Sequence, residues 1–184
     1  IHLDIFSYRR FHVSSPRPPP TSPLVPSTPP FRSAAQVRDF IKSPPQTNET
    51  RRSIILLPGF LSLAARFAQP LHLLELGASA GLNQNWDKFN YQTKTWRRDG
   101  ASDVTIQTDW RAPVPDHLDV ALDIASRAAC DLSPIDLTDA DQVRRLKCYT
   151  WADQPERLNR LDAAISLAQD SGTQVEAADA LAWL

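Results

Sequence analysis

Residues 71–83, LHLLELGASAGLN, carry the clearest structural pattern in the chain. The first six of these residues are mostly apolar and lie between Pro70 and Gly77, which is typical of a short β-strand buried on both faces. The small residues that follow allow a tight turn, and residues 84–89 are compatible with a helix. Exposed N–H groups where such a helix starts can hold an anionic or polar group. Glu75 would lie at the carboxyl end of the strand, where open α/β sheets bind ligands.

Four interpretations of this loop compete. The dinucleotide fingerprint fails because Ser79 and Leu82 occupy its second and third glycine positions, and the P-loop fails because no Gly-Lys-Ser/Thr follows. The hydrolase pattern G-x-S-x-G matches around Ser79, but the single downstream histidine, His117, follows too early for the usual strand positions. The first motif of S-adenosylmethionine (SAM)-dependent methyltransferases, an acid followed by spaced small residues, also matches. A turn packed for steric reasons alone is the alternative without a ligand.

Acidic residues follow two further segments that are predicted as strands. Asp131 comes directly after residues 125–130, and Asp179 comes shortly after residues 173–177. An acid at the end of the second strand binds ribose hydroxyls in nucleotide-binding α/β folds. An Asx-type turn explains Asp131 equally well, and a helix N-cap explains Asp179 at least as well.

These elements predict an α/β fold: a partial Rossmann-like, SAM-methyltransferase-like parallel sheet with flanking helices over residues 31–184. Strands near 71–76, 125–130 and 173–177 are expected to be parallel neighbours. Helices are expected over residues 31–69, with Pro58 starting a second helical piece. The nucleotide-binding corner is expected over residues 71–86.

A β-hairpin insertion is expected over residues 89–110. Residues 89–92 and 104–108 alternate loosely around the turn pair Asp99-Gly100. Four large aromatic residues gather in this region, and core packing explains them better than a ligand cage does. They are Trp86, Tyr91, Trp96 and Trp110.

The composition excludes several classes of function. With 42% apolar and 22% charged residues the chain is an ordinary globular protein, and a net charge of −1 predicts neither nucleic acid nor a membrane surface as partner. Cys130 and Cys148 suit the reducing cytoplasm, where each is expected to be a small buried residue. Together with four scattered histidines they predict no metal site. The sequence leaves the oligomeric state open.

The ends of the chain suggest a fragment. Residues 1–30 are rich in proline and serine and are expected to form a disordered leader. The chain starts at Ile1 and contains no methionine, so we expect a partial gene product whose sheet is truncated at the carboxyl end.

Four ordered blocks resemble a prokaryotic family called domain of unknown function 2332. They are PQTNE at residues 45–49, LELGASAGLN at 74–83, CDLSPID at 130–136 and WADQPERL at 151–158. The resemblance covers residues 31–184, and residues 1–30 depart from it. It implies no established activity, and it implies a longer carboxyl end than this chain has.

A separate similarity to SAM-dependent methyltransferases assigns roles in the corner. It implies the first motif at Glu75, Gly77, Ser79 and Gly81, with Asp131 binding ribose and Asp179 meeting the adenine amino group. The full set of cofactor-binding residues expected is Glu75, Gly77, Ala78, Ser79, Gly81, Asn83, Asp131 and Asp179. About fifty residues separate Gly81 from Asp131, where that fold usually has about twenty, so the hairpin insertion must absorb the difference.

The sequence therefore favours SAM-type small-molecule binding or methyl transfer, with no catalytic residue assigned and no activity expected of the fragment. Two alternatives stay open. One is a serine hydrolase that uses Ser79 as its nucleophile, and the other is a ligand-binding scaffold without catalysis.

Overall fold

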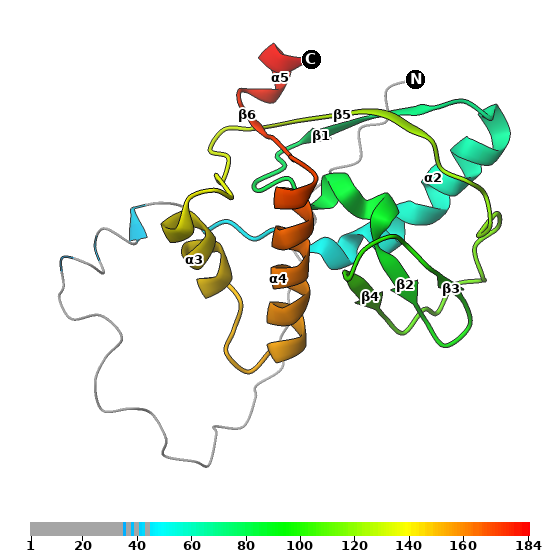
Figure 1. Cartoon of the computed structure of the whole chain (residues 1–184), viewed down its shortest axis with the longest axis horizontal. Helices are drawn as coiled ribbons and strands as arrows, with labels where there is room; N and C mark the ends of the chain where they lie inside the picture. Colours follow the sequence, from blue (N-terminus) through cyan, green and yellow to red (C-terminus); the bar gives the residue numbers. More distant parts are fainter. Residues whose placement is uncertain (1–34, 36–37, 39–40, 43–44) are drawn as a thin grey trace. The chain divides into compact units, whose positions relative to one another are not determined.

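A computed structural model describes residues 35, 38, 41, 42 and 45–184. The chain divides into two units, residues 1–43 and 44–184, and the second unit carries the fold described below (Figure 1). Ala35, Arg38 and Ile41 are helical, within the first of the helices expected. The expected disordered leader, residues 1–30, lies outside the described residues.

A parallel sheet forms the frame of the second unit. Its strands are β1 (Leu71–Leu76), β5 (Ile124–Asp131) and β6 (Glu176–Ala177), in the order β1-β5-β6 with both pairs parallel. Figure 1 shows β1 and β5 running side by side along one edge of the unit. The predicted parallel order is confirmed, although β6 is shorter than expected. The carboxyl ends of all three strands meet at one edge, because Leu76 pairs with Cys130 and Cys130 pairs with Glu176.

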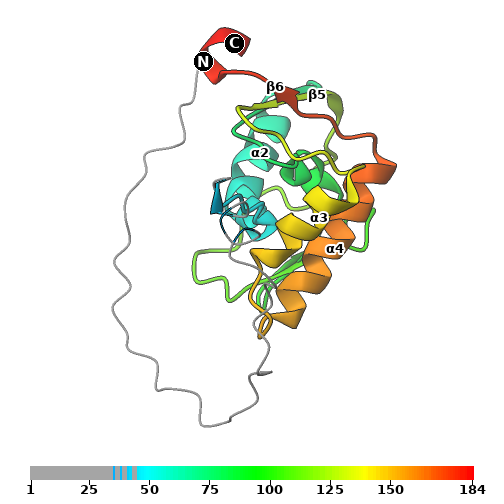
Figure 2. The same ribbon diagram turned by 90° about the vertical axis from the view of Figure 1, so that its left-hand side faces the viewer.

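Helices α3 (Ala140–Cys148) and α4 (Pro155–Asp170) lie side by side in both views (Figures 1 and 2). The α3 helix begins after its N-cap Asp139, whose carboxylate accepts hydrogen bonds from the amides of residues 141 and 142. The α4 helix begins with Pro155, whose missing N–H costs nothing in a first turn. A short helix, α5 (Ala180–Trp183), follows β6.

A 3₁₀ turn, η1 (Thr50–Arg52), leads into the single helix α2 (Ser53–Phe67). The expected break at Pro58 is wrong, because the helix runs through it. Proline removes one backbone hydrogen bond from a helix interior. Burial of one apolar face outweighs that loss, since Ile54, Leu57 and Leu61 are almost fully buried in the core.

The region between β1 and β5 holds a second sheet rather than the predicted hairpin. Its strands are β2 (Asn90–Gln92), β3 (Arg97–Arg98) and β4 (Thr105–Gln107), in the order β3-β2-β4. The β2 and β3 strands are antiparallel, but β2 and β4 are parallel. Direct hairpin pairing of residues 89–92 with 104–108 is therefore wrong.

Asn90 explains the parallel return of the chain. Its side chain accepts from the Gly100 amide at 2.9 Å and donates to the carbonyl of Ser102. A Cβ on Gly100 would overlap the carbonyl oxygens of Lys88 and Phe89, so only glycine fits there. The segment that leaves β3 is thus held against the start of β2, and β4 runs in the same direction as β2.

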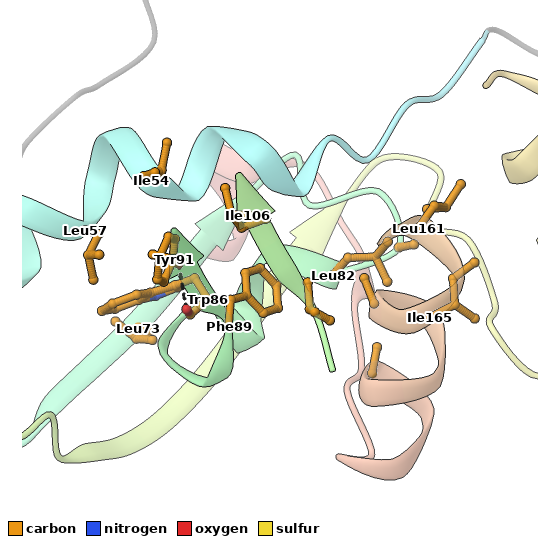
Figure 3. Packing of buried hydrophobic residues seen from close by; sticks show 14 of the residues in the cluster. Ile54, Leu57, Leu73, Leu82, Trp86, Phe89, Tyr91, Ile106, Leu161 and Ile165 are labelled. Atoms are coloured by element: carbon orange, nitrogen blue, oxygen red, sulfur yellow. Dashed lines mark hydrogen bonds between the residues drawn. The ribbon is translucent and has the colours of Figure 1, made fainter. Parts of the chain in front are cut away.

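The buried aromatic residues of the core lie in and around the second sheet. Figure 3 shows Trp86, Phe89 and Tyr91 together beside residues of α2. Tyr91 is 1% exposed, and its hydroxyl donates to the carbonyl of Trp86 at 2.7 Å. The Trp86 ring stacks on Phe60 at 4.3 Å, and Trp96 meets Trp110 edge to face at 5.3 Å. The prediction that these aromatic residues serve packing is confirmed.

Two smaller features complete the fold. Cys130 is buried as expected, but Cys148 at the end of α3 is exposed. Of the helices in the described part of the chain, none has the length and apolar character that a membrane crossing requires.

Candidate functional site

The predicted succession of strand, tight turn and helix is present at residues 71–88, although the helix is of a different kind. After β1 the chain turns through Gly77, Ser79 and Gly81, which all have positive φ values of 67°, 55° and 69°. It then enters η2 (Leu82–Lys88), a 3₁₀ helix where an α-helix over residues 84–89 was expected. An ion pair at 2.7 Å between Asp87 of η2 and Arg127 of β5 fixes this helix to the parallel sheet.

Ser79 holds a backbone conformation that costs a non-glycine residue about 1–2 kcal/mol. Three hydrogen bonds hold it there. Its amide donates to Asp131 at 2.8 Å, its hydroxyl donates to Gln46 at 3.1 Å, and its carbonyl accepts from the amide of Ile135 at 3.1 Å. Ser79 is only 8% exposed. It therefore anchors the loop from inside.

Asp131 joins this loop to the turn after β5. One carboxylate oxygen accepts from the Ser79 amide and the other from the Ser133 amide, both at 2.8 Å. The second bond is the Asx-type turn that the sequence left open as an alternative. A carboxylate has about four lone-pair positions, so two remain for a ligand hydroxyl.

The loop amides face the protein more than the sequence suggested. Those of Gly77 and Ala78 both donate to the carbonyl of Cys130, at 2.9 and 3.1 Å. The amide of Gly81 donates to the carbonyl of Ala78 at 2.8 Å. The amides of Gly77, Ala78 and Gly81 are therefore not free to bind an anion, because they are hydrogen-bonded within the loop and to β5.

The two outer glycines of the loop differ in surroundings. A Cβ on Gly81 would lie 2.8 Å from Val175 and 2.9 Å from Thr173, so Gly81 allows the loop to pack against the approach to β6. A Cβ on Gly77 would meet nothing within 4 Å. The exposed backbone at Gly77 therefore borders open space at the end of β1.

Glu75 is a titratable residue near the carboxyl end of β1, two residues before Gly77. Its oxygen Oε2 is buried without a hydrogen-bond partner, while the residue as a whole is half-buried. Burial, followed by the negative charge of Asp131, raises the pKa of Glu75 from 4.5 to about 7. A carboxyl group with this pKa at a strand end is a candidate for ligand or proton binding.

The remaining predicted residues lie around the same edge. Asn83, in η2, has its amide oxygen buried and without a partner. Asp179 caps α5, accepting from the amides of Leu181 and Ala182, which is the alternative the sequence offered for it. It stands two residues after Ala177, the partner of Asp131 in β6. Glu75, Asp131 and Asp179 thus each belong to the carboxyl end of a different parallel strand.

Residues 45–49 form a further segment of the corner, which the sequence pattern did not predict. Gln46 accepts from the Ser79 hydroxyl and donates to the carbonyl of Ser133 at 2.7 Å, closing a ring of hydrogen bonds with Asp131. Asn48 donates to the carbonyl of Ala78 at 2.6 Å. Thr47 or Asn48 would be a natural N-cap by residue type, but Glu49 caps η1. Only the block PQTNE pointed to this segment.

Glu49 also connects the segment to α4. Its carboxylate meets Arg157 at 2.9 Å and Arg160 at 3.2 Å. Burial acts to raise the pKa of Glu49, but the Arg51 amide and the two guanidinium charges lower it below its usual value. The two arginines of α4 therefore pair with Glu49 and do not form a purely solvated face of the helix. The Arg160 side chain is only 14% exposed.

The hydrolase arrangement is incomplete among the described residues. The Ser79 hydroxyl donates to a glutamine amide, which cannot take up its proton. His72 lies in β1 and bonds to Ser126 at 2.7 Å, and His117 lies in a loop with a φ of 61°. Neither histidine is hydrogen-bonded to Ser79, so the described part of the chain places no base of the triad type beside it.

The family model described as "Uncharacterized protein conserved in bacteria (DUF2332)" matches residues 31–184. The chain belongs to this family. The match includes segment 45–49, the corner and α4, so the contacts among them all lie within the DUF2332 domain. Neither the curated proteins nor the solved structures contain a match to the chain.

Proposed function

We propose that the corner at the carboxyl ends of β1, β5 and β6 binds a nucleoside-containing small molecule, with SAM as the expected ligand and methyl transfer as the reaction class. One observation carries the proposal. The Glu75 carboxylate keeps a buried oxygen without a partner, two residues before Gly77, whose missing side chain leaves open space. Buried polar atoms are rarely left unpaired, so an atom of this kind favours a ligand that completes it.

The arrangement of the sheet supports the location. Ligands of open parallel sheets bind outside the carboxyl ends of the strands, and here an acid lies in the last two residues of β1 and of β5 and two residues after β6. Asp131 retains lone pairs for a ribose hydroxyl after accepting two amides. Asp179 also retains lone pairs for a ligand after it accepts the two amides that it caps.

SAM supplies an activated methyl group when it is bound. The work left to this chain is to hold the ligand in position, which accounts for much of the rate enhancement in such reactions. Glu75 would hold a donor group of the ligand, and the Gly77 backbone would allow its close approach. No general base is assigned.

Isothermal titration calorimetry of SAM and S-adenosylhomocysteine with the whole chain tests the proposal. We expect measurable binding by the wild type and at least a tenfold loss with Gly77→Ala, because the new methyl group enters the open space. Gly172→Ala is the matched control. Gly172 has a similar positive φ of 63° and equally open surroundings, but it lies after α4, away from the corner. Absence of binding by the wild type at millimolar ligand would overturn the proposal.

Serine hydrolysis is the second candidate, supported by the G-x-S-x-G match and by the positive φ of Ser79. We expect a fluorophosphonate probe to leave Ser79 unlabelled, because its hydroxyl is buried and bonded to Gln46. Labelling that disappears in Ser79→Ala would establish the hydrolase and remove the methyltransferase proposal.

A further inference from the structure

We propose that Glu75 receives a positively charged group of the ligand and releases its proton to solvent as that group binds. The inference rests on the proposed function. It specifies in addition that the ligand group bound by Glu75 is positively charged. In the balanced step, the O–H bond of the Glu75 carboxyl breaks, the proton passes to buffer, and the carboxylate pairs with a sulfonium or ammonium group.

The geometry of Glu75 gives the first reason. Its Oε2 atom is buried and has no donor, and the described residues place no cation against the carboxyl group. The charged group that faces it is Asp131, on the neighbouring strand β5. An uncompensated carboxylate in such a place is costly, so the free protein stabilises the neutral acid.

Asp131 gives the second reason. Its two oxygens accept the Ser79 and Ser133 amides, so it is fixed as an acceptor next to Glu75. Rotation of Asp131 away from Glu75 would break the bonds that hold the loop. A positive charge from outside the protein can relieve the repulsion between the two acids without moving either.

The extent of proton release follows from the raised pKa. With a pKa of about 7 in the free protein, Glu75 is about 90% protonated at pH 6 and about half protonated at pH 7. A paired carboxylate titrates well below pH 6. We therefore expect about 0.9 proton released per ligand bound at pH 6 and about 0.5 at pH 7, as an order of magnitude.

Calorimetry in two buffers of different ionisation enthalpy counts these protons directly. SAM is titrated into the wild-type chain at pH 6, where the amino group of the ligand is itself protonated. Adenosine, which lacks both cationic groups, is the matched ligand. We expect release with SAM and none with adenosine. Glu75→Gln should abolish the release and weaken SAM at least tenfold, while exposed Glu176→Gln on β6 should change neither.

The possible outcomes distinguish failure of the proposed role of Glu75 from failure of the proposed SAM binding. SAM binding without proton release, or equal release with adenosine, would overturn the role of Glu75 and leave the binding site in place. Absence of SAM binding would remove both proposals. The wild-type proton count needs no substitution, so it decides the question even if a variant fails to fold.

Discussion

The parallel sheet and the small sheet of this protein are stabilised in different ways. The small sheet β3-β2-β4 and the adjoining η2 contribute Trp86, Phe89, Tyr91 and Ile106, none more than 6% exposed. Strand β1 of the parallel sheet leaves Leu74 60% exposed, and its carboxyl end is held by side-chain hydrogen bonds from elsewhere in the chain.

The aromatic core that stabilises the fold is therefore made of residues other than those to which the candidate function is assigned. A parallel sheet is usually covered on both faces, yet here the aromatic core gathers around the insertion between β1 and β5. The corner instead consists of polar groups that hold one another, with Glu75 left incomplete. Local strain and unpaired groups of this kind collect at functional sites when the surrounding packing can support them.

The largest effect we expect comes from removing the aromatic core. Phe89→Ala should lower the free energy of unfolding by about 3–5 kcal/mol, because Phe89 is 1% exposed and its loss leaves a cavity. Leu74→Ala is the matched apolar truncation on the parallel sheet. It should change the free energy of unfolding by about 0.5 kcal/mol or less, because Leu74 is already exposed. Urea unfolding followed by far-ultraviolet circular dichroism measures both. Equal losses would show that the two sheets contribute alike.

The same contrast explains what sequence could predict. Strands β1 and β5 and the loop between Gly77 and Gly81 follow from local apolar runs and glycine positions. The parallel return of β4 did not follow, because it depends on Asn90 bonding to residues ten and twelve positions away and on close packing at Gly100. Hydrogen bonds that join distant side chains leave no periodic signal.

The corner was predicted in position but not in detail. The eight candidate residues lie in or next to the loop and the strand ends, where the rule for parallel sheets places ligands. The partners of that loop, Gln46 and Asn48, come from 33 and 30 residues earlier in the chain. Local sequence could not decide whether Asp131 faces a ligand or a turn, since both choices need the same acid.

A smaller effect is expected from Glu75, and it depends on pH. Its pKa is raised from 4.5 to about 7 on folding. The folded state therefore binds the Glu75 proton more tightly than the unfolded state does. The stabilisation that this gives is fully present below about pH 4.5 and is lost as the pH rises through about 7. At pH 8, Glu75→Gln should be more stable than wild type by about 2 kcal/mol after allowance for solvent screening at this half-buried site.

Chemical unfolding at pH 4.5 and pH 8 measures this difference. The variant and the wild type should agree within about 0.5 kcal/mol at pH 4.5, where the wild-type carboxyl is protonated in the folded state. Glu176→Gln, at an exposed position on β6, should follow the wild type at both values. If the free energy of unfolding changed with pH by the same amount in Glu75→Gln and in the wild type, Glu75 would ionise normally. The corner would then carry no unpaired acid.

The smallest effect should come from Gln46, which bridges the loop after β1 and the turn after β5. Gln46→Ala removes the bonds to the Ser79 hydroxyl and the Ser133 carbonyl, at a cost of about 1 kcal/mol because both are partly open to water. Gln69→Ala, at an exposed position before β1, is the control. Hydrogen exchange of the Ser79 and Ser133 amides should accelerate only in Gln46→Ala, since the Asp131 ring then opens on one side. If exchange at both amides were unchanged, the Asp131 hydrogen bonds alone would fix the loop and the turn. Segment 45–49 would then pack over the corner without stabilising these bonds.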